Sequence, residues 1–319
     1  MPRTHTIPPD LVHYLWDAAN PPAVHIESGD TVVVETRDVA DNQVGPGSTS
    51  TDLANIELGR LYPLAGPVHV AGAEPGDTLA VEILSLETRG WGWAGLLPGL
   101  GLLADDFAEP YLRVFDLDTA QRDARGGQVT TLRDDILIPV EPFFGTMGVC
   151  PVGAQGQGVM PPGGFGGNID IRQLVAGATL YLPVQEPGAL FSCGDAHAAQ
   201  GDGEVCVTGI ESPMGGELRF SLHKGKRIPA PQYSLPAGPL TRRVDHGGWY
   251  ATTGVGGDLY RAAQDAVRAM IDHLAATRAL SREDAYMLCS LVVDLKISEV
   301  VDAGEYIVSA LLPDAVFLA

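Results

Sequence analysis

Short runs of apolar and β-branched residues, typical of β-strands, recur along the body of the chain. Between residues 179 and 222 such segments recur at roughly ten-residue spacing, as TLYLPV, ALFSC, EVCVTGI and ELRFSL. Further strand-like runs cover 111–116 and 135–140. Short strands separated by turns rich in glycine and proline are typical of an antiparallel sandwich or barrel.

The apolar period changes to 3.6 residues only near the C-terminus. Asp258 is a candidate N-cap, and a second helix is expected after Ser281, whose capping box would use Asp284. One face of the first helix carries the apolar residues Leu259, Ala262, Ala266, Met270 and Leu274. The chain then ends in strand-like LKISEVV and EYIVSALL.

These patterns predict a mainly β protein with two parts. Residues 1–254 are expected to form a β-sandwich or barrel body that carries the active site, open to division into two β subdomains. Residues 255–319 are expected to form an α+β unit packed on that body. Two segments without a clear period, 37–66 and 91–108, are long for connections in a compact protein, so either could form a lid over a site.

Charge and composition exclude several classes of partner. The net charge is −20, from 40 acidic and 20 basic residues, so the surface repels phosphate backbones and anionic lipid. We therefore expect no nucleic-acid partner and no membrane association. No run of 18 apolar residues is present, and the first residues lack the apolar segment of a signal peptide. The four cysteines show no CxxC spacing, which favours reduced thiols in a cytoplasmic protein.

Candidate chemistry is concentrated in residues 161–206. Asp195 and His197 are two positions apart, so in an extended segment they point to the same side and offer an oxygen and a nitrogen to a divalent metal. Asp170 could supply a third ligand. Glu204 could add a ligand or act as a general base, and Asp202 is either a further carboxylate or part of a Gly-Asp-Gly turn.

Other residues have two interpretations each. Glu141 ends an apolar strand, where it either faces the same cavity or is simply solvated. Cys193 lies four residues before His197. It is either a thiol nucleophile or a small core residue. Aromatic side chains that could form the walls, and whose bulk would favour a small acyl group, are Trp91, Trp93, Phe143, Phe144 and Phe165.

Several of these stretches together resemble the acetamidase/formamidase family. They are GDTVVVETRD (29–38), PLAGPVHVAGAEPGDTLAVEIL (63–84), PFFGTMGVCP (142–151), PPGGFGGNIDIRQLVAGATLYLPV (161–184) and PGALFSCGDAHAAQGDGEVCVTGIESPM (187–214). The resemblance implies hydrolysis of short aliphatic amides, such as formamide or acetamide, to a carboxylate and ammonia. It also implies a mostly β scaffold that forms a homodimer or higher homo-oligomer, with a bound divalent metal.

Roles can be assigned to the matching positions as a hypothesis. Asp170, Asp195 and His197 are expected to hold the metal, with Zn²⁺ as the first choice and Ca²⁺ as the alternative. The cation would polarise the amide carbonyl and activate a water. Candidates for the acid–base residue are Glu204, Glu141 and Asp195. Backbone amides of the glycine turns at 163–168 or 194–195 could stabilise the oxyanion, and the expected substrate contacts are Gly167, Asn168 and Phe144.

Two other functions remain open from the sequence. One is hydrolysis of cyclic amides on the same scaffold, as in a γ-lactamase. The other is a homologue that binds a small amide without turning it over. Release of ammonia from linear amides would distinguish a linear amidase from a non-catalytic homologue. Turnover of a γ-lactam would identify a hydrolase of cyclic amides.

Overall fold

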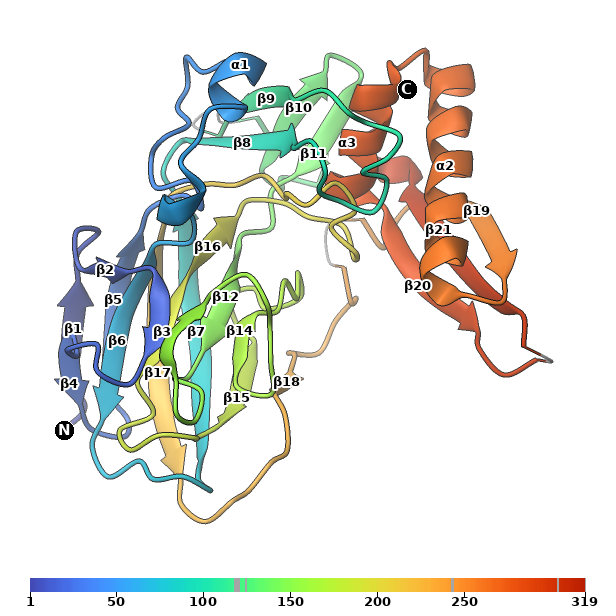
Figure 1. Ribbon diagram of the computed structural model, residues 1–319. Coiled ribbons are helices and arrows are strands. Elements are labelled where there is room, and N and C mark those ends of the chain that lie inside the picture. Colours follow the sequence, from blue (N-terminus) through green and yellow to red (C-terminus); the bar gives the residue numbers. More distant parts are fainter. Residues whose placement is uncertain (118–120, 124, 242–243, 303, 319) are drawn as a thin grey trace.

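Two six-stranded sheets form the larger part of the protein, which the computed structural model describes at residues 1–117, 121–123, 125–241, 244–302 and 304–318. The sheets lie face to face as a β-sandwich (Figure 1). The first sheet has the order β1 (Thr4–Ile7), β5 (Thr31–Thr36), β17 (Met214–His223), β7 (Thr78–Thr88), β15 (Thr179–Pro183), β18 (Gln232–Ser234). The second has the order β14 (Gly166–Asn168), β12 (Phe143–Gly148), β16 (Phe191–His197), β6 (Leu64–Val70), β2 (Val12–His13), with β4 (Val24–Ile26) also paired to β6.

The core between the two sheets follows from the alternating pattern in the sequence. In β5 every second residue is buried, so Val32 and Val34 face the second sheet. Phe191 of β16 and Phe220 of β17 meet edge to face across the interface, with ring centroids 5.1 Å apart. The predicted β-sandwich body is therefore confirmed.

Three two-stranded ribbons and a C-terminal unit complete the fold. The ribbons pair β3 (Leu15–Asp17) with β13 (Gln155–Gly158), β8 (Trp91–Leu96) with β9 (Tyr111–Asp116), and β10 (Val129–Arg133) with β11 (Ile136–Pro139). The C-terminal unit has a sheet of order β19 (Trp249–Gly256), β21 (Tyr306–Pro313), β20 (Asp294–Glu299) and the helices α2 (Leu259–Arg278) and α3 (Arg282–Val292). Short helical turns are α1 (Ser50–Leu53) and the 3₁₀ segments Leu58–Arg60 and Asp314–Val316.

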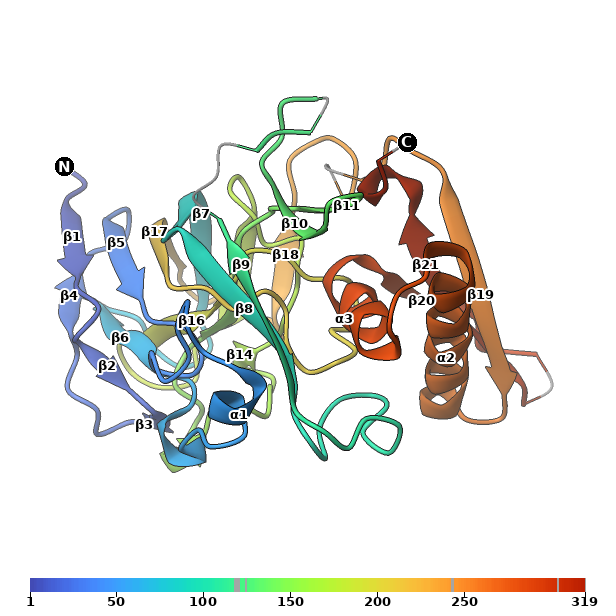
Figure 2. The ribbon, with the colours of Figure 1, turned by 90° about the horizontal axis from the view of Figure 1, so that it is seen from above.

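Both predicted helix starts are confirmed by their caps. The Asp258 carboxylate accepts a hydrogen bond from the Arg261 amide at 2.8 Å, and the Ser281 hydroxyl accepts one from the Asp284 amide at 3.1 Å. Figure 2 shows α3 between the β8–β9 ribbon and α2. The helices share a second core with β8 to β11 and with residues 198–210. The C-terminal sheet begins at Trp249, so the expected boundary after residue 254 falls inside β19; the division into domains stays a prediction.

Two segments differ from their predicted structure. Residues 204–210, predicted as a strand, form turns, because Glu204 and Val207 adopt φ values of 42° and 75° that no strand allows. The first part of 91–108, predicted as an irregular loop, is strand β8, whose apolar residues are buried between the sandwich and the helices. An uninterrupted apolar run lacks the alternation that marks a half-buried strand.

All four cysteines are buried and free, as predicted. No helix within the described ranges is long and apolar enough to cross a membrane.

A buried ion pair joins the C-terminal unit to the sandwich. The Arg172 guanidinium donates to Asp294 Oδ1 at 2.6 Å, and the backbone amide of Asp202 donates to the same oxygen at 2.9 Å. Both charged side chains are almost fully buried. One carboxylate therefore fixes the segment after β14, the segment after β16 and the start of β20 relative to one another.

We expect Arg172→Met to lower the free energy of unfolding by about 3–5 kcal/mol, because it leaves the Asp294 carboxylate buried without its cation. The double variant Arg172→Met/Asp294→Leu should lose much less, since neither charge then remains in the interior. Urea unfolding followed by circular dichroism measures both. Equal losses in the single and double variants would contradict this account.

Candidate active site

Strand β16 ends in the candidate site. Its last residue, His197, forms an antiparallel bridge with Glu211, which in turn forms a bridge with Trp93 of β8. Bridged residues project their side chains to the same side of a ladder. The chain that leaves the sandwich at His197 therefore returns at Glu211 and brings that carboxylate beside the imidazole.

Four carboxylates surround His197. Its Nε2 lies 3.1 Å from Glu211 Oε2, 3.3 Å from Asp195 Oδ1 and 3.9 Å from Glu204 Oε1. Asp170 joins Asp195 and His197 in a group whose ligand atoms all lie within 4.8 Å of one another, and His197, Glu204 and Glu211 form a second such group. The structure thus brings together Asp170, Asp195, His197 and Glu204, as the sequence predicted, and adds Glu211.

Gln200 fixes the tautomer of His197. The Gln200 Nε2 donates to the backbone carbonyl of Asp170 at 3.0 Å, which turns its Oε1 towards His197 Nδ1 at 2.7 Å. Because Oε1 can only accept, Nδ1 carries a proton, and in the neutral ring Nε2 then presents its lone pair to the carboxylates. A lone pair that faces anionic oxygens is repulsive unless a proton or a metal cation lies between them.

The charges of the cluster perturb each other strongly. Burial raises the pKa of the Asp170 carboxyl to about 7, and the neighbouring Asp195 adds to this shift. Burial likewise raises the pKa of Glu211 to about 7 and that of Glu204 well above its ordinary value. Burial alone would lower the pKa of His197, but the charges of Glu211 and Asp195 outweigh it and raise that pKa. The groups of the cluster therefore hold protons more tightly than free side chains do, and a bound cation would displace those protons.

Backbone strain is concentrated at the same place. Asp170, Asp195, Glu204 and Tyr62 have φ values of 45°, 51°, 42° and 60°, in the left-handed region. Asp tolerates this region, whereas Glu and Tyr rarely adopt it. Each such residue costs about 1–3 kcal/mol and persists only where the surroundings enforce it. The cluster also needs Gly145 of β12, since a Cβ there would lie 2.4 Å from Asp170 Oδ1 and 2.7 Å from the Asp195 carbonyl oxygen.

A cavity of about 250 Å³ opens above the cluster. Its floor carries Asp170, Asp195, Glu204 and Glu211. The rest of its lining is Val39, Ile56, Leu61, Tyr62, Trp93, Leu97, Leu100, Met160, Asn168, Val207 and Thr208. Both segments that were considered as lids, 37–66 and 91–108, contribute to this lining; their role as a lid stays a prediction.

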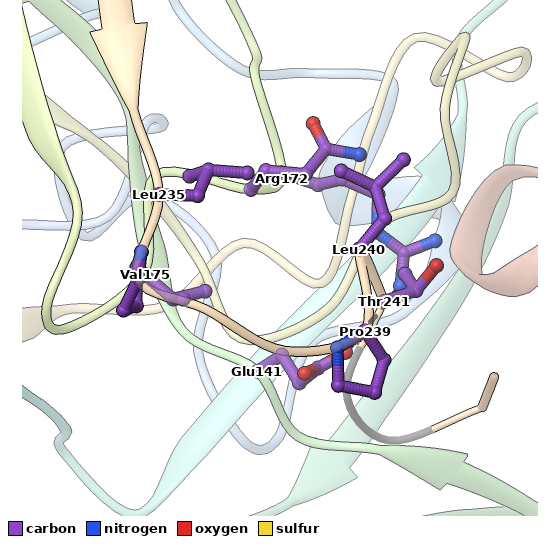
Figure 3. A pocket seen from close by; sticks show the side chains of 9 residues that line it. Glu141, Arg172, Val175, Leu235, Pro239, Leu240 and Thr241 are labelled. Atoms are coloured by element: carbon purple, nitrogen blue, oxygen red, sulfur yellow. Dashed lines mark ion pairs between the residues drawn. The ribbon is translucent and has the colours of Figure 1, made fainter. Parts of the chain in front are cut away.

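Glu141 does not line this cavity, contrary to one of the two interpretations of its position. Its carboxylate faces a different, much smaller pocket, where Arg172 Nη2 lies 3.6 Å away (Figure 3). The loop that carries Leu240 and Thr241 closes the other side of that pocket. Asp202 also lies outside the cavity: it occupies a turn, and its carboxylate accepts hydrogen bonds from Gln173 Nε2 at 3.0 and 3.1 Å.

The expected substrate contacts are only partly placed at the cavity. Asn168 lines it, but its amide is already engaged with Thr146 and the Met160 carbonyl. Phe144 points into the core between the sheets, because side chains alternate along β12 and it is Phe143 that packs against the His197 ring at 5.1 Å. Gly167 pairs with Met147 and lies outside the lining.

Most of the expected walls, and two of the expected oxyanion donors, are also placed elsewhere. Of the five aromatic residues expected as walls, the lining includes only Trp93. The backbone amides of Gly163 and Gly166 donate to each other's carbonyl oxygens at 2.9 and 3.0 Å, so they are not available to an oxyanion.

Sequence reasoning missed Glu211, Gln200 and Tyr62. Glu211 stands in GIESP, where a lone acid before a proline gives no signal of a ligand, and only the bridge to His197 reveals it. Tyr62 belongs to the segment without a period and reaches the cavity through a left-handed φ. Gln200 lies three residues after His197, a spacing that could have suggested a partner for its ring.

Comparison with known proteins gives a consistent result. The sequence profile described as the Acetamidase/Formamidase family matches residues 4–154 and 150–319. An acetamidase of Mycolicibacterium smegmatis is 28% identical over 269 residues, which are 67% of this chain and 66% of that protein. The chain thus spans slightly less than two thirds of that relative.

Two solved structures are similar over nearly the whole chain. A gamma lactamase from Delftia acidovorans superposes with a TM-score of 0.87 at 25% identity, covering 96% of this chain and 89% of that one. An acetamidase from Bacillus halodurans superposes with a TM-score of 0.67 at 30% identity, covering 97% of both.

We expect Zn²⁺ to raise the melting temperature of metal-free protein at pH 8 by about 5 °C or more, because a cation that binds only the folded state stabilises it. Glu211→Gln should diminish this increase, since it removes a ligand. The same variant should raise the melting temperature of the metal-free form, since it relieves repulsion among the acids. Differential scanning calorimetry measures both quantities.

The matched control is Glu217→Gln, which removes the same charge from an exposed position on β17. An equal response of Glu211→Gln and Glu217→Gln to Zn²⁺ would show that Glu211 is not a ligand, and no response of the parent protein to Zn²⁺ would show that the cluster binds no zinc.

Proposed function

Because this chain belongs to the acetamidase/formamidase family, we propose that it hydrolyses the C–N bond of primary amides and releases ammonia and a carboxylate. The observation that carries the proposal is the acidic cluster around His197 at the floor of a largely apolar cavity. Formamide and acetamide are the first substrates to test, since the similar proteins include an acetamidase.

The residues of the cluster fit a divalent metal. Two buried carboxylate oxygens, Asp170 Oδ1 and Glu211 Oε2, make no hydrogen bond to the described part of the chain, and His197 Nε2 presents a lone pair beside them. Asp170, Asp195, His197 and Glu211 would hold the ion, and Glu204 lies beside them with its carboxylate left for proton transfer. The imidazole favours Zn²⁺, whereas the oxygen-rich remainder keeps Ca²⁺ as the alternative. Once bound, a cation there polarises an amide carbonyl and makes water a better nucleophile at neutral pH.

Glu204 is the best placed acid–base residue. Its side chain is 17% exposed, against 2% for Glu211 and 5% for Asp195, so it is the member of this group that substrate and water reach. Its raised pKa means that this carboxyl holds and returns a proton more readily than an ordinary carboxyl does. In the proposed reaction Glu204 takes a proton from the attacking water. It then delivers that proton to the amide nitrogen as the C–N bond breaks.

Tyr62 is the proposed donor to the oxyanion. The side-chain donors of Trp93, Asn168 and Thr208 are all bound to protein acceptors. For the Tyr62 hydroxyl no partner is found in the described part of the chain, although it lines the cavity. Burial, reinforced by the charge of Asp195 and the other acids, raises its pKa, so the phenol stays protonated and can donate.

Hydrolysis of a cyclic amide is the second candidate, and the likeness to a gamma lactamase favours it. The same groups would act on a lactam, but the released amine would remain attached to the product. A protein that binds amides without hydrolysing them is the third candidate, and only an assay can exclude it.

Activity and metal content test the proposal together. We expect ammonia release from acetamide that is lost on chelation and restored by Zn²⁺. Asp195→Ala and His197→Ala should both lose bound metal and activity, because each removes a ligand. A γ-lactam assayed in parallel tests the second candidate. Full metal content and activity in both variants would end the metal hypothesis, and no turnover of any amide would end the enzymatic one.

Tyr62→Phe should lower kcat/KM for acetamide by about 10²–10³, mainly through kcat, because the donor acts on charge that develops in the transition state. Metal content should stay at the parent level, since the phenol is not a ligand. The control is Tyr233→Phe on the exposed strand β18, which should behave as the parent. A Tyr62→Phe enzyme with parental kcat would exclude this role.

The finer expectations from the sequence stay predictions. They are a homodimer or higher homo-oligomer and a location in the cytoplasm. The four free cysteines are compatible with a reducing compartment, and light scattering of the purified protein measures the number of subunits.

A further inference from the structure

We infer that the preferred substrate is a primary amide with an uncharged, apolar acyl group of about five to eight carbons, larger than formyl or acetyl. The inference rests on the proposed function, because it concerns the same cavity. What carries it is the wall above the acidic floor, which consists mainly of aliphatic and aromatic side chains and encloses more space than a small amide fills.

The wall is a built surface rather than a loose loop. The apolar wall consists of Val39, Ile56, Leu61, Trp93, Leu97, Leu100, Met160 and Val207. Several of these belong to a third, small core. Asp38, which is fully buried, accepts hydrogen bonds from Trp93 Nε1 at 3.1 Å and from the amides of Ala40 and Asn42 at 3.0 and 2.7 Å. This carboxylate holds the segment after β5 against β8, so the shape of the wall is fixed.

A second anchor holds the far end of the same segment. Asp41 Oδ2 accepts from Arg60 Nη2 at 2.7 Å and from the Tyr14 hydroxyl at 3.0 Å, while its Oδ1 accepts from Arg37 at 2.7 Å. The Tyr62 amide then donates to the Val39 carbonyl at 2.9 Å. The segment 37–62 is thereby closed on itself, with Ile56 and Leu61 turned to the cavity.

The size of the cavity is too large for acetamide alone. A protein cavity of about 150 Å³ lined by apolar side chains binds benzene. In proportion, the cavity of about 250 Å³ here accommodates roughly ten non-hydrogen atoms. Acetamide has only four, so most of the apolar wall would face water. A longer acyl chain displaces that water and adds favourable transfer free energy with each methylene.

The distribution of charge orients the substrate and limits its class. All four carboxylates are on the floor, and no lysine or arginine is among the described residues of the lining. A carboxylate on the acyl chain would therefore find no partner, which disfavours amides such as glutamine. The mouth has Leu100 and Met160, which are 39% and 42% exposed. An apolar chain can thus extend from the floor towards this rim with the amide group at the acids.

A series of straight-chain primary amides tests the inference. From acetamide to hexanamide we expect kcat/KM to rise about fourfold per methylene, or about 100- to 300-fold in total, as each methylene is removed from water. Glutamine should be a poorer substrate than butanamide. A kcat/KM that is flat or falls with chain length, in an enzyme that hydrolyses acetamide, would overturn the inference and leave the proposed function standing.

Variants that reduce the cavity localise the effect. Ile56→Phe and Leu97→Phe should lower the ratio of kcat/KM for hexanamide to that for acetamide at least tenfold, because the added ring occupies the space of the acyl chain. The matched control is Leu58→Phe, since Leu58 lies two residues from Ile56 but is 68% exposed and outside the lining. Its ratio should equal that of the parent. Parental ratios in both cavity variants would show that the acyl chain does not contact this wall.

Binding separates the inference from the proposed function. If no amide is hydrolysed, the proposed function fails, and isothermal titration calorimetry with hexanamide and acetamide then decides the inference alone. Tighter binding of hexanamide, by about the same factor per methylene, supports the inference. Equal or undetectable binding of the two amides overturns it.

Discussion

The structure depends on how four carboxylates are held around one imidazole nitrogen. Glu211 and Asp195 approach His197 Nε2 to 3.1 and 3.3 Å, and Gln200 directs the ring proton to the other nitrogen. In the low dielectric of a buried site, such an arrangement is unfavourable without a compensating cation. A protein gains nothing in stability from this cluster. The arrangement is therefore evidence of function, in the same way as the strained backbone at Tyr62 and Glu204.

The scaffold explains how this arrangement is tolerated. The site lies where β16 leaves the sandwich core and enters the second core around the helices, with a third core above it. Each acid is attached to one of these packed bodies: Asp195 to β16, Glu211 through its bridge to β8, and Asp170 to the segment that Arg172 ties to Asp294. Because the three cores cannot move independently, their packing fixes the positions of the four carboxylates. The carboxylates therefore stay close together despite their mutual repulsion.

The sequence predicts the parts of this protein that depend on local pattern. Alternation predicts the sandwich, Asp258 and Ser281 mark the helix starts, and the two-residue spacing of Asp195 and His197 brings both to one site. The sequence pattern fails where the position of a residue depends on long-range pairing. Glu211 joins the site through a bridge to His197, and Glu141 is absent from it because its carboxylate faces Arg172 in a separate pocket. The period of a sequence predicts on which side of its own strand or helix a residue lies, but it does not predict which residues of other elements lie opposite.

The residues that line the cavity could not be predicted from the sequence pattern either. Large aromatic residues near the motif suggested a small acyl pocket, but Phe144 and Phe165 fill the core between the sheets. The wall is instead supplied by aliphatic residues of a segment whose sequence has no period. That segment is ordered by two carboxylates, Asp38 and Asp41. The hydrogen bonds that they accept take the place of the backbone pairing that would order a strand. Such a segment can change its apolar side chains without disturbing the acids of the floor. Under the proposed function, the same acidic cluster can then serve amides with different acyl groups.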